Sequence, residues 1–515
     1  MPKLVPSRSP LGVYYRSPLG VRGTGGKEIH QYMEFQITAP LQTAFYISLQ
    51  ESRITYPDGT IAAWNETLRH KAGNNGWYFC ERGTWNIYIT PPAFIIEYYY
   101  GPITLVPGGN TYSPENPCPM TGVRFNRGLY KVKELDAQRT SISYLDVRPL
   151  KNLKTLHAGG GKIYGWDDHA YVDEVDFENA FLTELELGNH LLESMDLHFV
   201  AISALEKEGI PNLKHLDIRH SGALEILDFS GMPKLEEASV YSSTIQEALF
   251  FECPLLQMLS IFNCPLLSNL DFHGNPSLED LAVYFNGNPS LNLSIYPRDY
   301  ENNRIGANIK KLDCSDLKSL KTLFVDCCPL LEEIDLTNGL SLKSIFINDC
   351  DSLSTLTLSS LPLLIGNPPS IYPLIIFDCA SLVSLDISGC KNLTCLKVNR
   401  TSLSFIDLSD MDKDEGMNVD LRKNALEDIR FGVLSEIQIF HLNAAWNNFS
   451  QSKVVGILRM VYDHIILHPW LTGGSLILTY TKHTQDFPSD FWTKWDELDD
   501  DYGWTINISQ APFPW

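Results

Sequence analysis

The stretch PNLKHLDIRHS, GALEILDFSGM, PKLEEASVYSS spans residues 211–243, and CPLLQMLSIFN, CPLLSNLDFHGN and PSLEDLAVYFN follow it over residues 253–286. Each piece carries apolar residues in the order L-x-x-L-x-I/V/F, and the L-x-I part alternates as a short strand with one buried face does. The leading apolar residues are spaced 11, 11, 10, 11, 11 and 11 apart, at Leu213, Leu224, Leu235, Ile245, Leu256, Leu267 and Leu278. The same frame returns at Leu320, Leu331, Leu342 and Leu353, and again at Leu382, Leu393 and Leu403.

Two such strands fit in one coil of 21 or 22 residues, which is inside the range of roughly 20 to 29 residues for leucine-rich repeats. Asn, Gly, Cys and Pro recur directly after the strands, as in FNCP and DCCP, where the chain must turn. The pieces ILDFSGM, NLDFHGN, EIDLTNG, SLDISGC and FIDLSDM resemble the L-x-x-L-D-L-S-x-N units of bacterial internalin-type and surface-protein leucine-rich repeats. The resemblance implies a mainly β, leucine-rich-repeat solenoid over residues 129–450.

The spacing is interrupted at residues 287–308 and 363–375, so we expect loops or enlarged coils there. Six cysteines fall directly after strands, at Cys253, Cys264, Cys328, Cys350, Cys379 and Cys390. They could form a metal ladder or a set of disulfides. A column of small buried thiols along the coil corner is the interpretation we favour, because free cysteine behaves as a small hydrophobic residue.

The N-terminal part differs from the repeats. Residues 27–128 contain alternating runs such as YMEFQIT, AFYISLQ and GTWNIYI, separated by Pro, Gly and Asn, which predict a β-sandwich. The pieces PDGTIAAW and GTWNIYI resemble segments of PKD-like domains. Residues 1–26 hold the tandem copies SPLGVYY and SPLGVRG, which predict an extended anchoring tail or a disordered leader. The anchoring residues would be Tyr14, Tyr15, Arg16, Leu19 and Arg22.

Beyond residue 450 the apolar period becomes helical. SKVVGILRMVYDHIILH predicts an amphipathic helix with Ser452 as its N-cap, and SDFWTKWDELDDD predicts a second helix with Ser489 before its start. Strands are expected in GSLILTYT and GWTINIS. Residues 451–515 are therefore predicted to form an α/β cap over the last coil. The order of these elements resembles the terminal segment of leucine-rich-repeat proteins in bacterial surface and phage tail proteins.

Composition and motifs exclude several functions. The formal net charge of −22 argues against a nucleic-acid partner. No apolar run approaches the length of a membrane span, and the first residues lack the apolar core of a secretory signal. Nothing in the sequence matches a catalytic motif that we tested, and the acidic run at residues 410–418 lacks the spacing of a calcium loop. We therefore expect no enzymatic activity, no metal site and no cofactor.

Outward positions of the strands predict where a partner binds. Side chains four and six places after the first Leu of each piece should point out of the sheet. One set of pieces carries aspartates there, at Asp228, Asp271, Asp335, Asp386 and Asp407. The other carries aromatic residues, at Tyr241, Phe262, Tyr284, Phe324 and Phe346, and predicts an aromatic stripe on one wall. The stripe is either a binding surface for a partner or is covered by residues 287–308 or by another copy of the chain.

The first functional hypothesis is a structural or receptor-binding component of a virion or phage-tail-like particle, made in the cytoplasm and anchored by the tail. Its partners would be proteins of the assembly, a host receptor or a glycan, and a homo-oligomer is compatible with it. The alternatives are a bacterial surface adhesin and, less favoured, a glycan-active enzyme on a repeat scaffold. Neighbouring genes for capsid or tail proteins would support the first hypothesis over the second.

Overall fold

The computed structural model describes residues 31–37, 44–49, 52–55, 71–72, 77–79, 83–89, 96–106, 109–112, 120–125, 133–138, 142–159, 182–241, 243–284, 307–359, 361–365, 373–411, 417–432, 440–469, 473–478 and 487–508. The chain forms two compact units, residues 1–224 and residues 225–515, and each is described by itself. Both contain coils of a leucine-rich-repeat solenoid, so the predicted mainly β fold class is confirmed.

The first unit begins with two antiparallel groups of strands. One has the order β3 (Ser52–Thr55), β6 (Gly83–Ile89), β1 (Gln31–Ile37) and β9 (Met120–Phe125). The other joins β4 (Lys71–Ala72), β5 (Trp77–Phe79), β2 (Ala44–Leu49), β7 (Ile96–Val106) and β8 (Gly109–Tyr112). Ile96 of β7 also pairs in parallel with Leu135, in the first strand of the solenoid. The predicted sandwich region therefore continues directly into the repeat sheet.

The solenoid coils of the first unit alternate between two walls. The strands of the long sheet pair in parallel in the order β10 (Glu134–Gln138), β12 (Thr155–Gly159), β14 (Ser194–Val200) and β15 (His215–Ser221). The opposite, short wall contains β11 (Tyr144–Asp146) paired with β13 (Glu184–Glu186).

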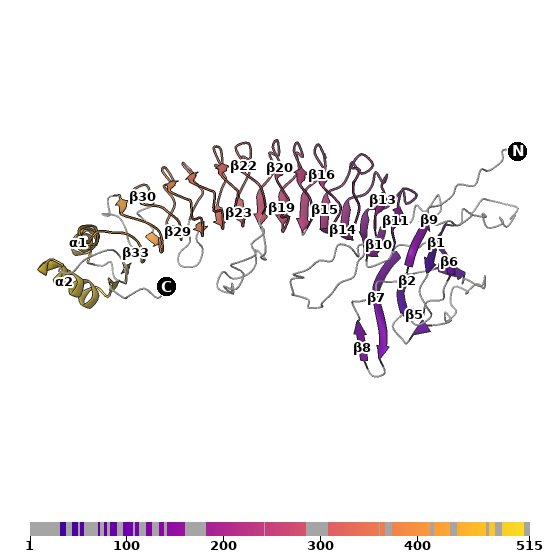
Figure 1. Ribbon diagram of the computed structural model, residues 1–515, viewed down its shortest axis with the longest axis horizontal. Coiled ribbons are helices and arrows are strands. Elements are labelled where there is room, and N and C mark those ends of the chain that lie inside the picture. The colour runs from indigo at the N-terminus through magenta and orange to yellow at the C-terminus, as the bar shows by residue number, and fades with distance from the viewer. Residues whose placement is uncertain are drawn as a thin grey trace. The chain divides into compact units, whose positions relative to one another are not determined.

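The second unit repeats this arrangement, with the long strands on one side of the coils and the short strands on the other (Figure 1). Its long sheet consists of β17 (Glu237–Tyr241), β19 (Met258–Phe262), β21 (Asp280–Tyr284), β23 (Thr322–Asp326), β25 (Ser344–Asn348), β27 (Leu374–Phe377), β29 (Cys395–Asn399), β31 (Met417–Asp420) and β33 (Phe440–Asn443). Its short wall consists of β16 (Ile226–Asp228), β18 (Glu247–Leu249), β20 (Asn269–Asp271), β22 (Lys311–Asp313), β24 (Glu333–Asp335), β26 (Thr355–Thr357), β28 (Ser384–Asp386), β30 (Phe405–Leu408) and β32 (Asp428–Phe431).

The coils share one apolar interior, to which both walls contribute alternate side chains. Leu256, Leu267, Leu278, Leu331 and Leu342 are all 0% exposed, as the repeat frame predicts. Parallel pairing aligns successive coils in register; Met258 for example lies opposite Asp280 and Thr322 opposite Ser344. The long sheet also continues across both predicted interruptions, because β21 pairs with β23 and β25 with β27. Residues 285–306 and 366–372 themselves lie outside the described residues.

The coil corners are fixed by buried side chains directly after the strands. Asn424 accepts hydrogen bonds from the backbone N–H and hydroxyl of Thr401 and donates to the carbonyls of Val398 and Leu421. On the short-wall corner, Asn275 accepts from the N–H of Cys253 at 2.7 Å. These amides satisfy backbone groups that the turn leaves unpaired inside the coil.

The six cysteines of the repeat frame are buried and unbridged, in agreement with the favoured interpretation. They do not form one column, however, because they follow strands of both walls. Cys264, Cys328, Cys350 and Cys379 follow strands of the long sheet, whereas Cys253 and Cys390 follow short-wall strands. Burial raises the pKa of Cys264 to about 12, so its thiol is a packing group and not a reactive thiolate.

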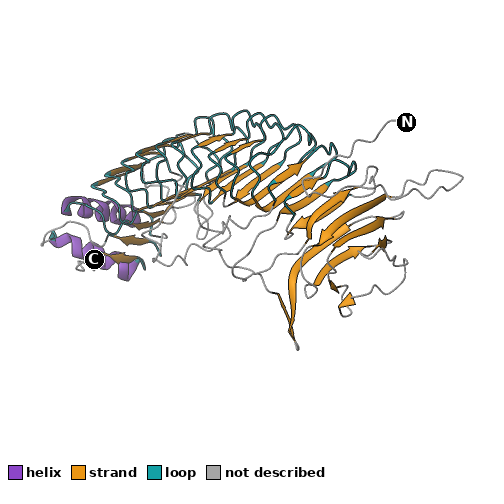
Figure 2. Ribbon diagram, turned by 45° about the vertical axis from the view of Figure 1, so that its right-hand side comes forward, coloured by secondary structure: helices purple, strands orange, loops and turns teal. Residues whose placement is uncertain are grey.

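The C-terminal segment extends the long sheet and covers its side with helices. β34 (Ser475–Ile477) pairs with β33, and β35 (Thr505–Asn507) pairs with β34. The helices α1 (Gln451–Leu467) and α2 (Ser489–Asp496), the latter continuing into the π-helical turn η4 (Glu497–Asp501), lie beside these last strands (Figure 2). No described helix is long and apolar enough to cross a membrane.

Both predicted helix starts were wrong by a small margin. The N-cap of α1 is Ser450, whose hydroxyl accepts from the N–H of Lys453, and not Ser452. Ser489 is the first residue of α2, after the N-cap Pro488. Serines at 450 and 452 are equivalent cap candidates in the sequence, so the residue pattern alone does not separate them.

Candidate binding face

The outward side chains of the long sheet in residues 225–515 form a surface that the solenoid core does not use. Register pairing aligns one outward residue of each strand into a central column: Ser239, Ser260, Ala282, Phe324, Phe346, Ile375, Lys397 and Asp420. The column changes from small residues to apolar ones and then to charged ones. Its apolar centre is formed by Phe324, Phe346 and Ile375, which are half-buried.

The aromatic residues predicted as one stripe lie in two columns. Phe324 and Phe346 stack with ring centroids 4.4 Å apart in the central column. Tyr241, Phe262 and Tyr284 pair with one another two residues further along their strands, where the rings of Tyr241 and Phe262 stack at 4.3 Å. Phe262 is only 5% exposed, and the side chain of Tyr284 lies outside the described atoms. The expectation of a single stripe is therefore corrected to two short stacks.

An acidic pair follows the apolar centre at the end of β23 and β25. The side-chain amide of Asn348 donates to Asp326 at 2.7 Å and to Asp349 at 3.1 Å. The thiol of Cys327 donates to Asp349 at 3.5 Å. Burial, reinforced by the charge of Asp349, raises the pKa of Asp326 to about 7. This carboxyl group is thus held partly protonated at neutral pH beside the apolar centre.

A pocket continues from this pair along the corner residues of the next two coils. It is lined by Asp349, Asp351, Asp378, Ala380, Arg400, Thr401 and Ser402. Arg400 Nη1 lies 3.2 Å from both carboxylate oxygens of Asp378, and the Arg400 guanidinium lies 5.1 Å from the ring centroid of Phe377. Asp378 is therefore already paired with a cation inside the pocket, and the remaining acids, Asp349 and Asp351, give it acidic character.

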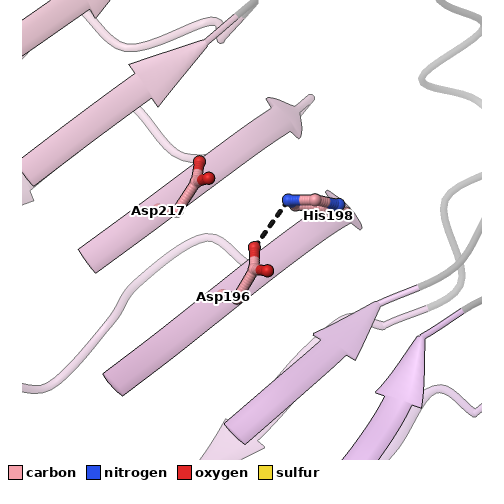
Figure 3. A group of neighbouring side chains, drawn as sticks. All are labelled: Asp196, His198 and Asp217. Atoms are coloured by element: carbon pink, nitrogen blue, oxygen red, sulfur yellow. Dashed lines mark ion pairs between the residues drawn. The ribbon is translucent and has the colours of Figure 1, made fainter. Parts of the chain in front are cut away.

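Two sets of side chains in the described residues have the donor types that a metal ion needs. One is Asp326, Cys327 and Asp349, but there the N–H groups of Asn348 already lie between the two carboxylates. The other is Asp196, His198 and Asp217 on the long sheet of the first unit (Figure 3). Neither set was predicted from the residue pattern. A signal was present for the second, because DLH at 196–198 precedes DIR at 217–219 by one coil length.

Ile375 and the pocket were not predicted from the repeat pattern either. Ile375 lies in the segment that breaks the repeat spacing, and pairing of β27 with β25 is what places it beside Phe346. The pocket is formed by residues of the coil corners, whose positions the alternating strand pattern does not predict. The anchoring-tail residues Tyr14, Tyr15, Arg16, Leu19 and Arg22 lie outside the described residues.

Comparisons with known proteins find similar solved structures. The internalin InlF of Listeria monocytogenes aligns over 76% of this chain and 90% of its own, at 12% identity and a TM-score of 0.28. The functional domain of InlJ from Listeria monocytogenes, described as including a cysteine ladder, covers 68% and 69%, at 15% identity and a TM-score of 0.23. YopM from Yersinia enterocolitica covers 74% and 91%, at 15% identity and a TM-score of 0.21. No protein-family model matches the sequence, and no curated protein matches it.

Proposed function

We propose that this chain is a non-enzymatic recognition protein, and that it binds a protein segment on the outer face of the long sheet in residues 225–515. The observation that carries the proposal is the apolar centre of Phe324, Phe346 and Ile375 in the central outward column. Side chains at these positions cannot reach the solenoid core, because alternate residues of a strand face opposite sides of the sheet. Stacked aromatic rings inside a polar rim are typical of the centre of a protein interface.

The surroundings of this centre indicate the chemistry of the partner. On one side of the centre the column holds only small side chains, those of Ser239, Ser260 and Ala282. On the other side it holds the charged residues Lys397 and Asp420. The acidic pocket begins at Asp349, directly after β25. A segment that presents one apolar side chain to Phe346 and one Lys or Arg to Asp349 and Asp351 would match both features. A glycan would match the aromatic stack alone.

The biological setting that we propose is inferred from the sequence alone. A virion or phage-tail-like particle, with residues 1–26 as the anchor, is the setting that the tandem tail favours, and a bacterial surface adhesin is the alternative. The proposed recognition surface depends on neither setting, because each of its residues lies in the described coils of the second unit.

A displayed library of random peptides, selected on the purified chain, tests the proposal. We expect enriched peptides that combine an apolar residue with Lys or Arg and that lose at least about tenfold in affinity for Phe346→Asp, a central contact. The matched control is Ile226→Asp, which makes the same kind of change at a 53% exposed position on the short wall. Peptides that bind Phe346→Asp as tightly as the wild type, or a selection that enriches nothing, would contradict the proposal.

A further inference from the structure

The first unit carries a group of acid and imidazole side chains that the proposed function does not use. Asp196 and His198 project from β14, and Asp217 projects from the neighbouring strand β15, all toward the same side of the sheet (Figure 3). Asp196 and Asp217 are register partners. The donor atoms of all three side chains lie within 4.8 Å of one another.

Neighbouring residues hold the two carboxylates in place. His157 Nδ1 lies 3.0 Å from Asp196 Oδ2 across the β12–β14 pairing. Arg219 Nε lies 3.0 Å from each oxygen of Asp217. His157 and Arg219 lie outside the three-residue group and fix the orientation of the two carboxylates, as hydrogen-bond partners of metal ligands do.

The third side chain of the group, His198, is in contact with the first. His198 Nε2 and Asp196 Oδ1 form an ion pair at 2.5 Å, and both atoms are buried and make no aligned hydrogen bond within the described part of the chain (Figure 3). Gly159, the last residue of β12, packs against the backbone of His198, where a Cβ would lie 1.9 Å from the carbonyl oxygen. Only glycine fits at this position beside the group.

From this arrangement we infer that Asp196, His198 and Asp217 form a binding site for a divalent transition-metal ion such as Zn²⁺. Two carboxylate oxygens and one imidazole nitrogen suit zinc, manganese or iron, whereas magnesium and calcium prefer oxygen ligands alone. Asp196 and Asp217 occupy directly paired positions, where two like charges repel one another. A cation between β14 and β15 would be shared by both carboxylates and by His198, whose donor atoms lie within 4.8 Å of one another.

Three protein ligands leave a coordination position for water or for a donor group of a bound molecule. The site lies on the outer side of the sheet, where its side chains are 22–27% exposed, and the donor atoms Asp196 Oδ1 and His198 Nε2 themselves are buried. The competing interpretation is a hydrogen-bonded His157, Asp196, His198 network that never binds metal, and the experiment separates the two.

The test is titration of the metal-free, full-length chain with Zn²⁺, in competition with a chromogenic chelator, and with Co²⁺ as a spectroscopic probe. The variants are His198→Ala and Asp217→Asn, each checked for an unchanged circular dichroism spectrum. The control is His273→Ala, which removes another histidine paired with an aspartate, Asp271 at 2.6 Å, where the described residues supply no third ligand. Using two ligand variants keeps the test decisive if one of them fails to fold.

We expect the wild type and His273→Ala to bind zinc with the same affinity, and both ligand variants to lose at least about tenfold. The visible spectrum of bound Co²⁺ should change with the same two variants and not with the control. Equal zinc affinity in His198→Ala and wild type, or an absence of saturable binding in wild type, would overturn the inference.

Discussion

On the short wall of residues 225–515, an outward aspartate recurs on β16, β22, β24, β28 and β30, and each accepts a hydrogen bond from the N–H of the residue two places later. On the long sheet of the same coils, the equivalent outward column holds Ser, Ala, Phe, Ile, Lys and Asp in turn. On the short wall, the outward side chain is used to stabilise the turn that follows its own strand. On the long sheet, the residue type at the outward position varies from coil to coil, as a recognition surface requires.

The largest expected effect comes from buried leucines, and it shows whether the long sheet and the short wall contribute equally to the stability of the core. Leu323 on the long sheet and Leu312 on the short wall are each 0% exposed. Replacing either by alanine should lower the free energy of unfolding by about 3 kcal/mol, because each change removes buried methyl groups and leaves a cavity. Urea denaturation of the two variants measures this. A cost below about 1 kcal/mol for Leu312→Ala alone would show that the short wall packs loosely.

Aspartates of the two walls should respond to pH in opposite ways. Burial raises the pKa of Asp326, on the long sheet, to about 7. Its folded form therefore keeps a proton that the unfolded chain releases near its ordinary pKa of 3.8, so stability falls as pH rises from about 4 to about 7. Asp326→Asn should remove this loss and stabilise the protein by about 2 kcal/mol at pH 8, with little gain at pH 4. Thermal unfolding at both pH values is the measurement, and an equal gain at both would contradict it.

Asp313, on the short wall, should show the reverse. Hydrogen bonds from the hydroxyl and the N–H of Ser315 lower the pKa of the Asp313 carboxyl group. Its stabilisation is thus fully present above the unfolded value of 3.8 and is lost as pH falls through the lower folded value. Asp313→Ala should cost about 1 kcal/mol at pH 7, as loss of a cap does. That cost should shrink toward pH 3; the control Asp280→Ala, on the long sheet, should cost less at pH 7.

The sequence predicted the coils because a spacing of 11 residues constrains every buried leucine at once. It also separated the aspartate set from the aromatic set, since the two alternate along the chain. The prediction of a single aromatic stripe was wrong, and the positions of the rings along their strands show why. Tyr241 and Phe262 come six places after their leading Leu, whereas Phe324 and Phe346 come four places after theirs. These positions face the same side but differ by two residues along the strand, which is about 7 Å.

The sites depend on pairing between coils, which the sequence shows less directly. Asp196 and Asp217 become neighbours because β14 and β15 pair without offset. Ile375 joins Phe346 because the chain returns to the same register after an irregular segment. Coil length alone predicts the first of these contacts. The second depends on where a non-repeating segment ends, and periodicity contains no information about that position.

The smallest expected effect concerns Phe324 and Phe346, and it decides whether their stack serves the fold. Because both rings are half-buried on the outer face, each alanine variant should cost well under the 3 kcal/mol expected for a core leucine. Their coupling in a double-mutant cycle should be about 0.5 kcal/mol, the lower end for stacked aromatic pairs. Urea denaturation of the wild type, both single variants and the double variant measures it. If the coupling instead exceeded about 1.5 kcal/mol, the stack would be a structural element of the sheet, and the long sheet would resemble the short wall in using its outward side chains for stability. A small coupling leaves the pair available for a partner, since residues that contribute little to folding retain their apolar surface for binding.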